Sequence, residues 1–361
     1  MKLNDAVIHH DNFGHALDDL KKQDLPLLIY GAGNLAEAVF KKLNENNIRV
    51  AGFFTDNGGE EFLGYSVVSI SNLAFYGKQG CNVILGFAAA YRKKEFLYGV
   101  DAVNKVFELD NPFEHHKKFD HDFFYNNRQS FSEIYHLLED ELSRESFIAF
   151  VNCRVNQSSS YAVNVSPADI DEFYNDVFKL SHREVFLDVG AYRGGSIERF
   201  LMSVCGKYKK IIAIEPETEN FRFLNEFVQT KKLDNISLHQ IGCWYEKGRL
   251  AFNNEENKCC RIEEEADFYI DVDSLDNICE FEDEISVINI GISTALCEIV
   301  QGASSIIKAD LPKIIVFMGA AKEELFLIPK LIKNIDSRYG IYFRFQSSMA
   351  SRLFLYAIPR L

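Results

Sequence analysis

The chain has 361 residues, 47% of them hydrophobic and 25% charged, which is enough for two domains that each bury a core. Its formal net charge of −14 excludes a general nucleic-acid or anionic-membrane surface, because such partners are bound mainly through clustered Lys and Arg. We therefore expect a small-molecule partner, with no nucleic acid and no membrane. The N-terminal residues lack the apolar core of a secretory signal and the longest apolar runs are strand-sized, which predicts a cytoplasmic protein.

Neither the cysteines nor the histidines are spaced like metal ligands. Cys259 and Cys260 lie in a charged segment that favours a surface loop, and no Cys-x-x-Cys occurs in the chain. The cluster of His115, His116 and His121 suggests a metal as one alternative. A solvated helix is favoured instead, because no interval sets two of these side chains beside a third ligand on one helical face. We therefore predict reduced thiols and no metal site.

Residues 1–112 carry the pattern of a small Rossmann-like domain. Strands are expected at 26–31, 49–56, 81–86 and 105–109, and helices at 34–46 and 91–98. Strands that alternate with helices pair in parallel. The following segment, 113–180, is polar and aromatic with apolar residues at helical intervals, so we expect a helical connector there.

Residues 181–361 predict a larger α/β domain. Strands are expected at 184–188, 210–215, 236–240, 286–290 and 313–317, with helices that begin near Ser196, Thr218, Ser293 and Lys322. The last two strands, 341–345 and 352–357, are separated by a polar loop too short for a crossover, so they must pair antiparallel. A parallel sheet that finishes in an antiparallel hairpin is expected of methyltransferases, whereas dehydrogenases usually continue with crossovers.

A glycine loop follows the first strand of this larger domain. The strand delivers Asp188 to its carboxyl end, and the loop 190–195 then turns into a helix whose first N–H groups are unpaired. A carboxylate two residues before the first glycine suits a cationic amino-acid tail rather than a diphosphate. The second strand ends in Glu215, where a carboxylate can meet the two hydroxyls of a ribose. The pair predicts a nucleotide-type cofactor, most simply S-adenosylmethionine; the alternative is two ordinary acids at strand ends.

Several segments together resemble the FkbM-type methyltransferase family: 184–191, 214–216, 272–276, 288–303 and 355–359. The resemblance covers most of residues 181–361 and implies S-adenosylmethionine-dependent O-methylation, often of sugars or polyketide-like hydroxyls. By matching position it implies a methionine side lined by Asp188, Gly190, Ala191, Tyr192 and Gly194, a ribose at Glu215, and an adenine edge at Gly242 and Cys243.

The sequence departs from this family after its fourth strand. The family usually carries Lys-Ile-Asp-Val-Glu-Gly-Ala-Glu there, and residues 289–296 of this chain keep none of those charges. A hydroxyl acceptor must lose its proton and be aimed, yet no general base is evident. Asn289, Ser293 and Arg344 are the candidates for orienting an acceptor, with polar caps and a solvated arginine as the alternative.

A second glycine loop lies in the N-terminal domain. Gly31, Gly33 and Asn34 belong to a Gly-x-Gly-x-x-Ala pattern that follows a strand and opens a helix, and Asp56 ends the next strand at the spacing of a ribose-binding acid. Asp56 fits a simple turn equally well. The stretches 52–56 and 63–67 are similar to the nucleotide-sugar-binding N-terminal domains of bacterial sugar acetyltransferases, which favours a sugar nucleotide over NAD as ligand.

Three functions follow from these motifs. The first is an S-adenosylmethionine-dependent methyltransferase acting on a hydroxyl of a sugar or sugar-linked metabolite, with a nucleotide sugar as a candidate acceptor. The second is a catalytically silent binding or regulatory protein, since the acidic motif at 289–296 is lost. The third is a nicotinamide-dependent oxidoreductase, which lacks an identifiable acid/base pair. Monomer and homodimer stay equally open.

Overall fold

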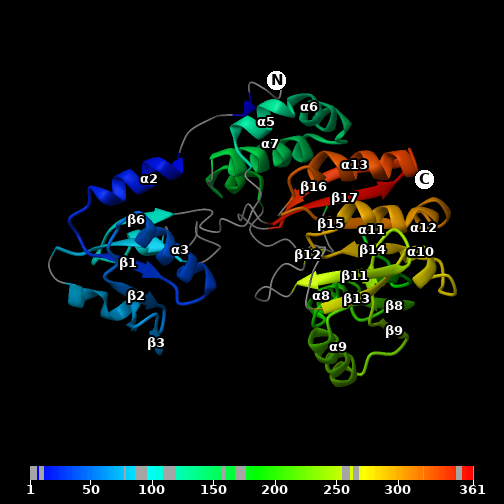
Figure 1. Ribbon diagram of the computed structural model, residues 1–361, viewed down its shortest axis with the longest axis horizontal. Helices are drawn as coiled ribbons and strands as arrows, with labels where there is room; N and C mark the ends of the chain where they lie inside the picture. Colours follow the sequence, from blue (N-terminus) through cyan, green and yellow to red (C-terminus); the bar gives the residue numbers. More distant parts are fainter. Residues whose placement is uncertain are drawn as a thin grey trace. The chain divides into compact units, whose positions relative to one another are not determined.

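The computed structural model describes residues 6–7, 12–76, 79–86, 96–108, 119–156, 159–166, 176–253, 261–262, 268–319, 321–346 and 352–360 (Figure 1). The chain divides into two compact units. The first comprises 1–128, 148–168 and 347–350, and the second comprises 129–147, 169–346 and 351–361. The segment 113–180 is therefore shared between the units. His115, His116, Cys259, Cys260 and most of the helix expected at 91–98 lie outside the described residues.

The first unit contains a six-stranded sheet in the order β3-β4-β2-β1-β5-β6. Its strands are β1 (Leu27–Tyr30), β2 (Gly52–Thr55), β3 (Glu61–Phe62), β4 (Tyr65–Ser69), β5 (Cys81–Leu85) and β6 (Val103–Glu108). All pairs are parallel except the β3–β4 hairpin. Strand β1 is flanked by β2 on one side and by β5 on the other, so the order in which strands are added reverses at β1. Open α/β sheets bind ligands at such a point.

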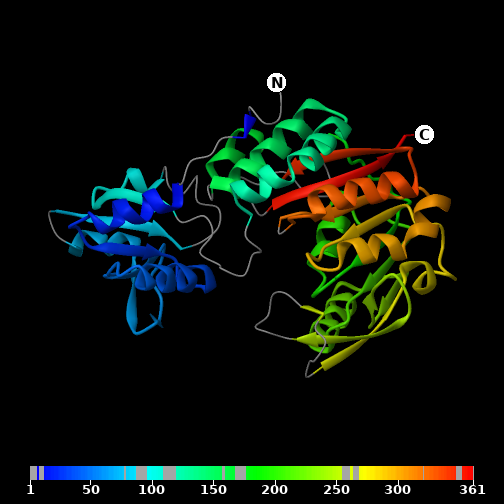
Figure 2. The same ribbon diagram turned by 45° about the horizontal axis from the view of Figure 1, so that its top comes forward.

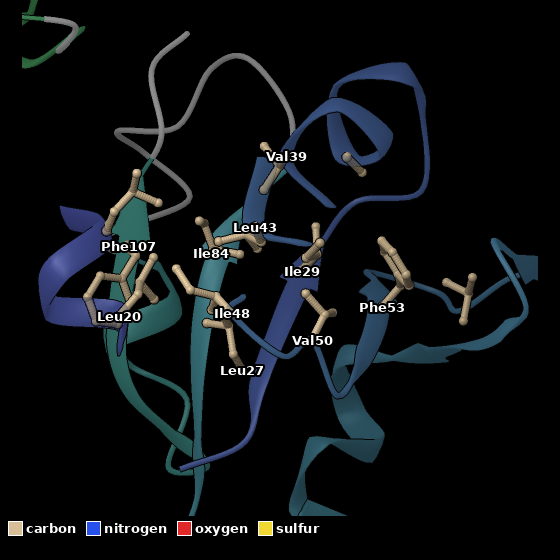
Figure 3. Packing of buried hydrophobic residues seen from close by; sticks show 13 residues of the cluster. Leu20, Leu27, Ile29, Val39, Leu43, Ile48, Val50, Phe53, Ile84 and Phe107 are labelled. Atoms are coloured by element: carbon tan, nitrogen blue, oxygen red, sulfur yellow. The ribbon is translucent and has the colours of Figure 1, made fainter. Parts of the chain in front are cut away.

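The first unit has two clusters of buried apolar residues, and the larger one lies between this sheet and the helices α2 (Asn12–Lys21) and α3 (Asn34–Glu45). The other helical elements of this unit are η1 (Ile70–Tyr76), α5 (His121–Asn126), the end of α7 (Glu141–Asn156) and η2 (Ser159–Val165). Figure 3 shows Val39 and Leu43 of α3 packed towards Ile29 and Ile84 of the sheet. These apolar residues recur at helical spacing in α3 and alternate in the strands, which is why the sequence specifies this packing.

The second unit contains a seven-stranded sheet in the order β16-β17-β15-β14-β7-β8-β9. Its strands are β7 (Val185–Val189), β8 (Lys210–Ile214), β9 (Ile236–His239), β14 (Val287–Ile290), β15 (Lys313–Phe317), β16 (Tyr339–Phe345) and β17 (Leu353–Pro359). Strand β17 is antiparallel to β15 and β16, and β7, β8, β9, β14 and β15 run parallel. The predicted α/β fold with a terminal hairpin is thus confirmed.

Helices cover both faces of the seven-stranded sheet. They are α6 (Arg128–Leu137), the start of α7, α8 (Gly195–Ser203), α9 (Thr218–Lys231), α10 (Leu275–Ile278), α11 (Leu296–Gly302), α12 (Ser304–Ala309) and α13 (Glu324–Ile335). Helices α11, α12 and α13 contact one another, and α13 lies against β16 (Figure 2). Right-handed crossovers place α8 and α9 on one face and the α11–α13 group on the other, because the strand order reverses between β9 and β14.

A four-stranded sheet of order β10-β13-β11-β12 was not predicted from the sequence. It consists of β10 (Gly242–Cys243), β11 (Gly248–Asn253), β12 (Arg261–Ile262) and β13 (Phe268–Asp273). Two of these strands have only two residues, so no alternation of apolar and polar residues marks them. This sheet connects the end of β9 to α10, and its first strand, β10, places Cys243 shortly after β9.

Candidate functional site

Asp188 lies at the carboxyl edge of the seven-stranded sheet, the edge at which its parallel strands end. The side chain is fully buried, and it is level with Asn289 of β14 on one side and Ala213 of β8 on the other. Its Oδ1 accepts a hydrogen bond of 2.8 Å from Asn289 Nδ2, and its Oδ2 accepts one of 2.5 Å from the Ser196 hydroxyl on α8. Two neutral side chains therefore fix the orientation of this carboxylate.

The glycine loop after β7 has a backbone that only glycine adopts easily. Gly190 has φ +78° and Gly194 has φ +89°, in the left-handed region. A Cβ on Gly190 would lie 2.1 Å from Ile292 Cγ2, and a Cβ on Gly194 would lie 2.5 Å from Phe227 Cδ1. The N–H groups of Gly190 and Ala191 both donate to the carbonyl of Ile214, each at 3.0 Å. The loop is thus held tightly between β8, the loop after β14, and α9.

Glu215 follows β8 and accepts two backbone hydrogen bonds. Its Oε2 accepts from the N–H of Tyr192 at 2.9 Å and its Oε1 from the N–H of Glu217 at 3.0 Å. The side chain is 6% exposed and forms no ion pair with any described residue. Burial, together with the charges of Glu217 and Asp188, raises its pKa above the ordinary value. The structure therefore brings Asp188 and Glu215 close enough to interact electrostatically, with the glycine loop joined to both.

The predicted adenine edge lies beside Glu215. Burial raises the pKa of the Cys243 thiol, and the charges of Cys279 and Glu215 raise it further, which places Cys243 near both groups. Gly242 is buried, and a Cβ there would lie 2.8 Å from Val272 Cγ1. The two-residue strand β10 pairs in parallel with β13, with Gly242 opposite Val272 and Cys243 opposite Asp273.

The three candidates for orienting an acceptor are not brought together. Asn289 is used to hold Asp188, and Ser293 is half-buried in the loop after β14, where its hydroxyl bonds to no other described residue. Arg344 lies on β16, three strands from β14. Only 2% of this residue is exposed, so the alternative of a solvated arginine is wrong.

Arg344 is a buried arginine at the centre of an ion-pair network whose two carboxylates are partly exposed. Its Nη2 donates to Asp140 Oδ2 at 2.6 Å and to Asp176 Oδ2 at 2.7 Å, and its Nη1 donates to the Ser143 hydroxyl at 2.8 Å. Its Nε donates to Asp176 Oδ1 at 2.9 Å. The guanidinium is fully engaged, and these bonds fasten the start of α7, whose first N–H groups Asp140 caps, to the edge strand β16.

The glycine loop of the first unit is open. Gly31 has φ +125° and its N–H donates to the carbonyl of Phe54 at 2.8 Å, while Gly33 and Asn34 are exposed and a Cβ on Gly33 would meet no atom within 4 Å. Asp56 is exposed at the end of β2, and one of its oxygens accepts a hydrogen bond from the Tyr30 hydroxyl. The loop, the start of α3 and Asp56 therefore share the carboxyl edge of this sheet at the point where strand order reverses.

Ala36, the last residue of the Gly-x-Gly-x-x-Ala pattern, has a packing role. Ala36 is fully buried, and a Cβ on Gly86 at the end of β5 would lie 2.8 Å from its Cβ. A larger residue at either position would push α3 away from the sheet. This close helix–sheet contact is the one that the fingerprint requires.

Sequence reasoning missed three residues at the carboxyl edge of the larger sheet. The sequence pattern marks Ser196 only as the start of a helix, and it marks neither Ile292 nor Glu323. The contact of Ile292 with Gly190 and the environment of Glu323 depend on tertiary packing, so no local pattern marks them. Ser196 alone carried a signal, because a hydroxyl in the first turn after a glycine loop faces the strand end.

Metal-ligand clusters and membrane-spanning helices are both absent from the described residues. No group of three or more His, Cys, Asp or Glu side chains there is arranged to hold a metal ion. No helix in the same part of the chain is long and apolar enough to cross a membrane.

Comparison with known proteins supports the fold assignment. No protein-family profile matches the sequence, and no curated protein matches it. Among solved structures, the chain is similar to methyltransferase FkbM from Methylobacillus flagellatus KT, with a TM-score of 0.70 and 17% identity over 98% of this chain and 99% of that chain.

About half of the chain also matches two other solved proteins. Precorrin-6y C5,15-methyltransferase from Geobacter metallireducens GS-15 has a TM-score of 0.35 and 11% identity over 54% of this chain and 94% of that chain. Aeropyrum pernix fibrillarin with natively bound S-adenosyl-L-methionine has a TM-score of 0.33 and 11% identity over 50% of this chain and 69% of that chain. The full-length match is the informative one, and it shows that this chain has the fold of methyltransferase FkbM.

Proposed function

We propose that the second unit binds S-adenosylmethionine and transfers its methyl group to a hydroxyl oxygen of a sugar or sugar-linked acceptor. The observation that carries this proposal is the pair of buried carboxylates, Asp188 and Glu215, at the ends of adjacent parallel strands with the glycine loop between them. The full-length likeness to a solved methyltransferase supports the same conclusion.

The charge of the site favours this cofactor over a dinucleotide. Glu215 is buried, its hydrogen bonds come from backbone N–H groups, and its pKa is raised, so ionisation there is not compensated by a described cation. A diphosphate would add negative charge beside it, which is unfavourable at low local dielectric. S-adenosylmethionine instead brings a positive charge and two ribose hydroxyls, which are donors that a carboxylate can accept. The residues present therefore fit this group.

The chain's own residues would position the reactants. S-adenosylmethionine, when bound, supplies a methyl group on a positively charged sulfur. Asp188 would face its amino-acid part, held by Asn289 and Ser196 so that little reorganisation is needed on binding. Glu215 would accept from the ribose hydroxyls while the backbone of Tyr192 keeps it in place. Cys243 and Gly242 would border the adenine.

The first unit is proposed to hold the acceptor through a nucleotide. The open backbone at Gly33, the start of the 12-residue helix α3 without a side-chain cap, and Asp56 fixed by Tyr30 are the features that support this role. A nucleotide sugar presents a diphosphate to the helix start and hydroxyls to Asp56. The solved structures compared above do not support the resemblance to sugar acetyltransferases. The proposal of a nucleotide sugar therefore depends on these features alone.

Titration calorimetry with S-adenosylmethionine tests the proposal. Glu215→Gln should bind about 10- to 100-fold more weakly than the unaltered protein, because it loses charge-assisted hydrogen bonds. Glu184→Gln is the matched control: Glu184 is equally buried at the opposite edge of the same sheet, and its loss should leave the affinity unchanged.

Methyl transfer is then measured with a panel of UDP-sugars. Transfer to one of them, lost in Glu215→Gln, is the expected result. Binding without transfer to any acceptor would favour a catalytically silent binding protein. This is the second candidate because Asn289 and Arg344 are engaged in structural contacts. No binding by the unaltered protein, or equal weakening in both variants, would contradict the proposal.

A further inference from the structure

A carboxylate with one oxygen that no described residue bonds follows β15, whose carboxyl end lies beside that of β14. This inference rests on the proposed function. If β8 and the glycine loop bind the cofactor, an acceptor must approach it from the ends of β14 and β15. Ile290 of β14 is level with Val316 of β15, so the loops that begin at Gly291 and Met318 leave the sheet together. Helices α11 and α13, which follow these loops, contact each other.

Glu323 lies at this place, immediately before α13. Its Oε2 is buried and has no hydrogen-bond partner among the described residues, although the side chain as a whole is 39% exposed. Its Oε1 lies 3.5 Å from Lys322 Nζ, whose side chain is 18% exposed. One oxygen is therefore oriented by an ammonium group, and the other is out of solvent with nothing donating to it.

The neighbouring acid behaves in the opposite way. Glu324 Oε2 accepts a hydrogen bond of 2.9 Å from the N–H of Lys322, which stabilises the first turn of α13. Burial and the charges of Glu298 and Glu324 raise the pKa of the Cys297 thiol on α11 to about 11, so Glu324 lies close to that helix. Glu324 thus has a structural role in the helix start, whereas Glu323 caps nothing.

A buried acceptor atom without a donor is costly to the fold and is rarely kept without a ligand that supplies the donor. Here the donor that fits is the hydroxyl of the acceptor, because the loop after β14 offers only the hydroxyls of Ser293 and Thr294 and no ionisable side chain. A carboxylate with one oxygen held by Lys322 is also preorganised for a single incoming O–H.

We propose that Glu323 accepts the proton of the acceptor hydroxyl during methyl transfer. In this step the hydroxyl oxygen forms a bond to the methyl carbon while the bond from that carbon to the positively charged sulfur breaks. The hydroxyl proton passes to Glu323 Oε2. The products are a methyl ether, the neutral thioether and a protonated carboxyl group, so charge and atoms balance.

Four variants test the role of Glu323, measured with S-adenosylmethionine and the UDP-sugar that the unaltered protein methylates fastest. Glu323→Gln should lower kcat at least 100-fold, with KM for the sugar and the affinity for S-adenosylmethionine within threefold of the unaltered values. Glu324→Gln should keep kcat within threefold. Glu323→Met should melt at the same temperature as the unaltered protein or higher, because it removes an unsatisfied atom, whereas Glu324→Met should melt lower.

The outcomes separate this inference from the proposed function. Failure of the unaltered protein to bind S-adenosylmethionine overturns the proposed function and the role of Glu323 with it. Normal binding and turnover with an unchanged kcat in Glu323→Gln overturns the inference alone. If no UDP-sugar is methylated, the melting temperatures decide: a lower value for Glu323→Met than for the unaltered protein overturns the inference, and an equal or higher value supports it.

Discussion

Glu184 lies at the amino edge of the seven-stranded sheet and Glu215 at its carboxyl edge, and both are buried, with exposures of 4% and 6%. Glu184 accepts a hydrogen bond of 2.6 Å from the N–H of Ser181, another from the Ser286 hydroxyl, and lies 3.5 Å from Lys313 Nζ. Glu215 accepts only from two backbone N–H groups among the described residues. The same residue type is thus fully compensated at one edge and not at the other.

The pKa values of the two carboxyls move in opposite directions for this reason. Burial raises the pKa of both, but at Glu184 the hydrogen bonds from Ser286 and Ser181 and the charge of Lys313 outweigh burial and lower it. At Glu215 the charges of Glu217 and Asp188 act in the same direction as burial. The charge of Glu184 is therefore compensated within the fold, whereas the charge of Glu215 is not compensated by a described cation, which fits the proposed ligand site.

The largest expected effect comes from adding one methyl group at the carboxyl edge. Gly190→Ala forces a side chain onto a residue with φ +78° and places Cβ 2.1 Å from Ile292 Cγ2, so we expect a loss of about 3 kcal/mol in the free energy of unfolding. Urea denaturation measures this loss, and calorimetry should show that cofactor binding is lost with it. Gly291→Ala is the control, because its Cβ would lie 3.6 Å from Asn289 Nδ2, an ordinary contact.

A second substitution sharpens the result at Gly190. Ile292→Ala in the same chain removes the overlapping methyl group and should recover part of the stability, but not the part due to the left-handed backbone. No recovery in the double variant would show that the contact with Ile292 is not what the glycine accommodates.

The next effect is a difference in pH dependence between the two edges. Glu184→Gln should lower the free energy of unfolding by about 1–2 kcal/mol at neutral pH. Because the pKa of Glu184 is lowered by folding, its stabilising contribution is complete above the unfolded value of 4.5 and is lost as the pH falls through the folded pKa. The gap between the variant and the unaltered protein should therefore close on acidification.

Glu215→Gln should show the opposite slope. Its pKa is raised by folding, so the contribution of Glu215 is present below the unfolded value of 4.5 and is lost as the pH rises through the folded pKa. Urea midpoints measured for both variants from about pH 3.5 to about pH 7.5, a window of about four units that includes the unfolded value, compare the slopes. If the stability difference between variant and unaltered protein changes with pH in the same direction for both residues, the proposed difference between Glu184 and Glu215 is wrong.

The fold was largely predictable from the sequence because its signals are local. The apolar runs that became β7, β8, β14 and β15 are short and alternate with segments of helical spacing, so a doubly wound parallel sheet followed from the crossover rules. Asp188 and Glu215 were predicted as a pair for the same reason. The four-stranded sheet was missed, since its shortest strands pair with distant partners and carry no period of their own.

The functional roles of polar residues were harder to predict because they depend on tertiary partners. Arg344 looked like a cleft residue, yet its partners Asp140 and Asp176 lie more than 160 positions away in the sequence, and nothing near Arg344 indicates them. Glu323 was overlooked for the converse reason. An acid at the start of a helix is ordinarily solvated, and only the structure shows that one oxygen of Glu323 is buried with no donor among the described residues.

The smallest effect compares two serines that each donate to a buried carboxylate, one at each edge. Ser286 donates to Glu184 and also accepts from the N–H of Val185, so Ser286→Ala should lower the free energy of unfolding by about 1 kcal/mol and leave cofactor affinity unchanged. Ser196 donates to Asp188, so Ser196→Ala should weaken cofactor binding about fivefold, because the carboxylate is less well oriented, with a smaller change in stability. Each variant serves as the control for the other in parallel calorimetry and urea denaturation. If both serines change stability alone, the carboxylates at the two edges are equivalent, and the hydroxyl of Ser196 holds the fold rather than a ligand site.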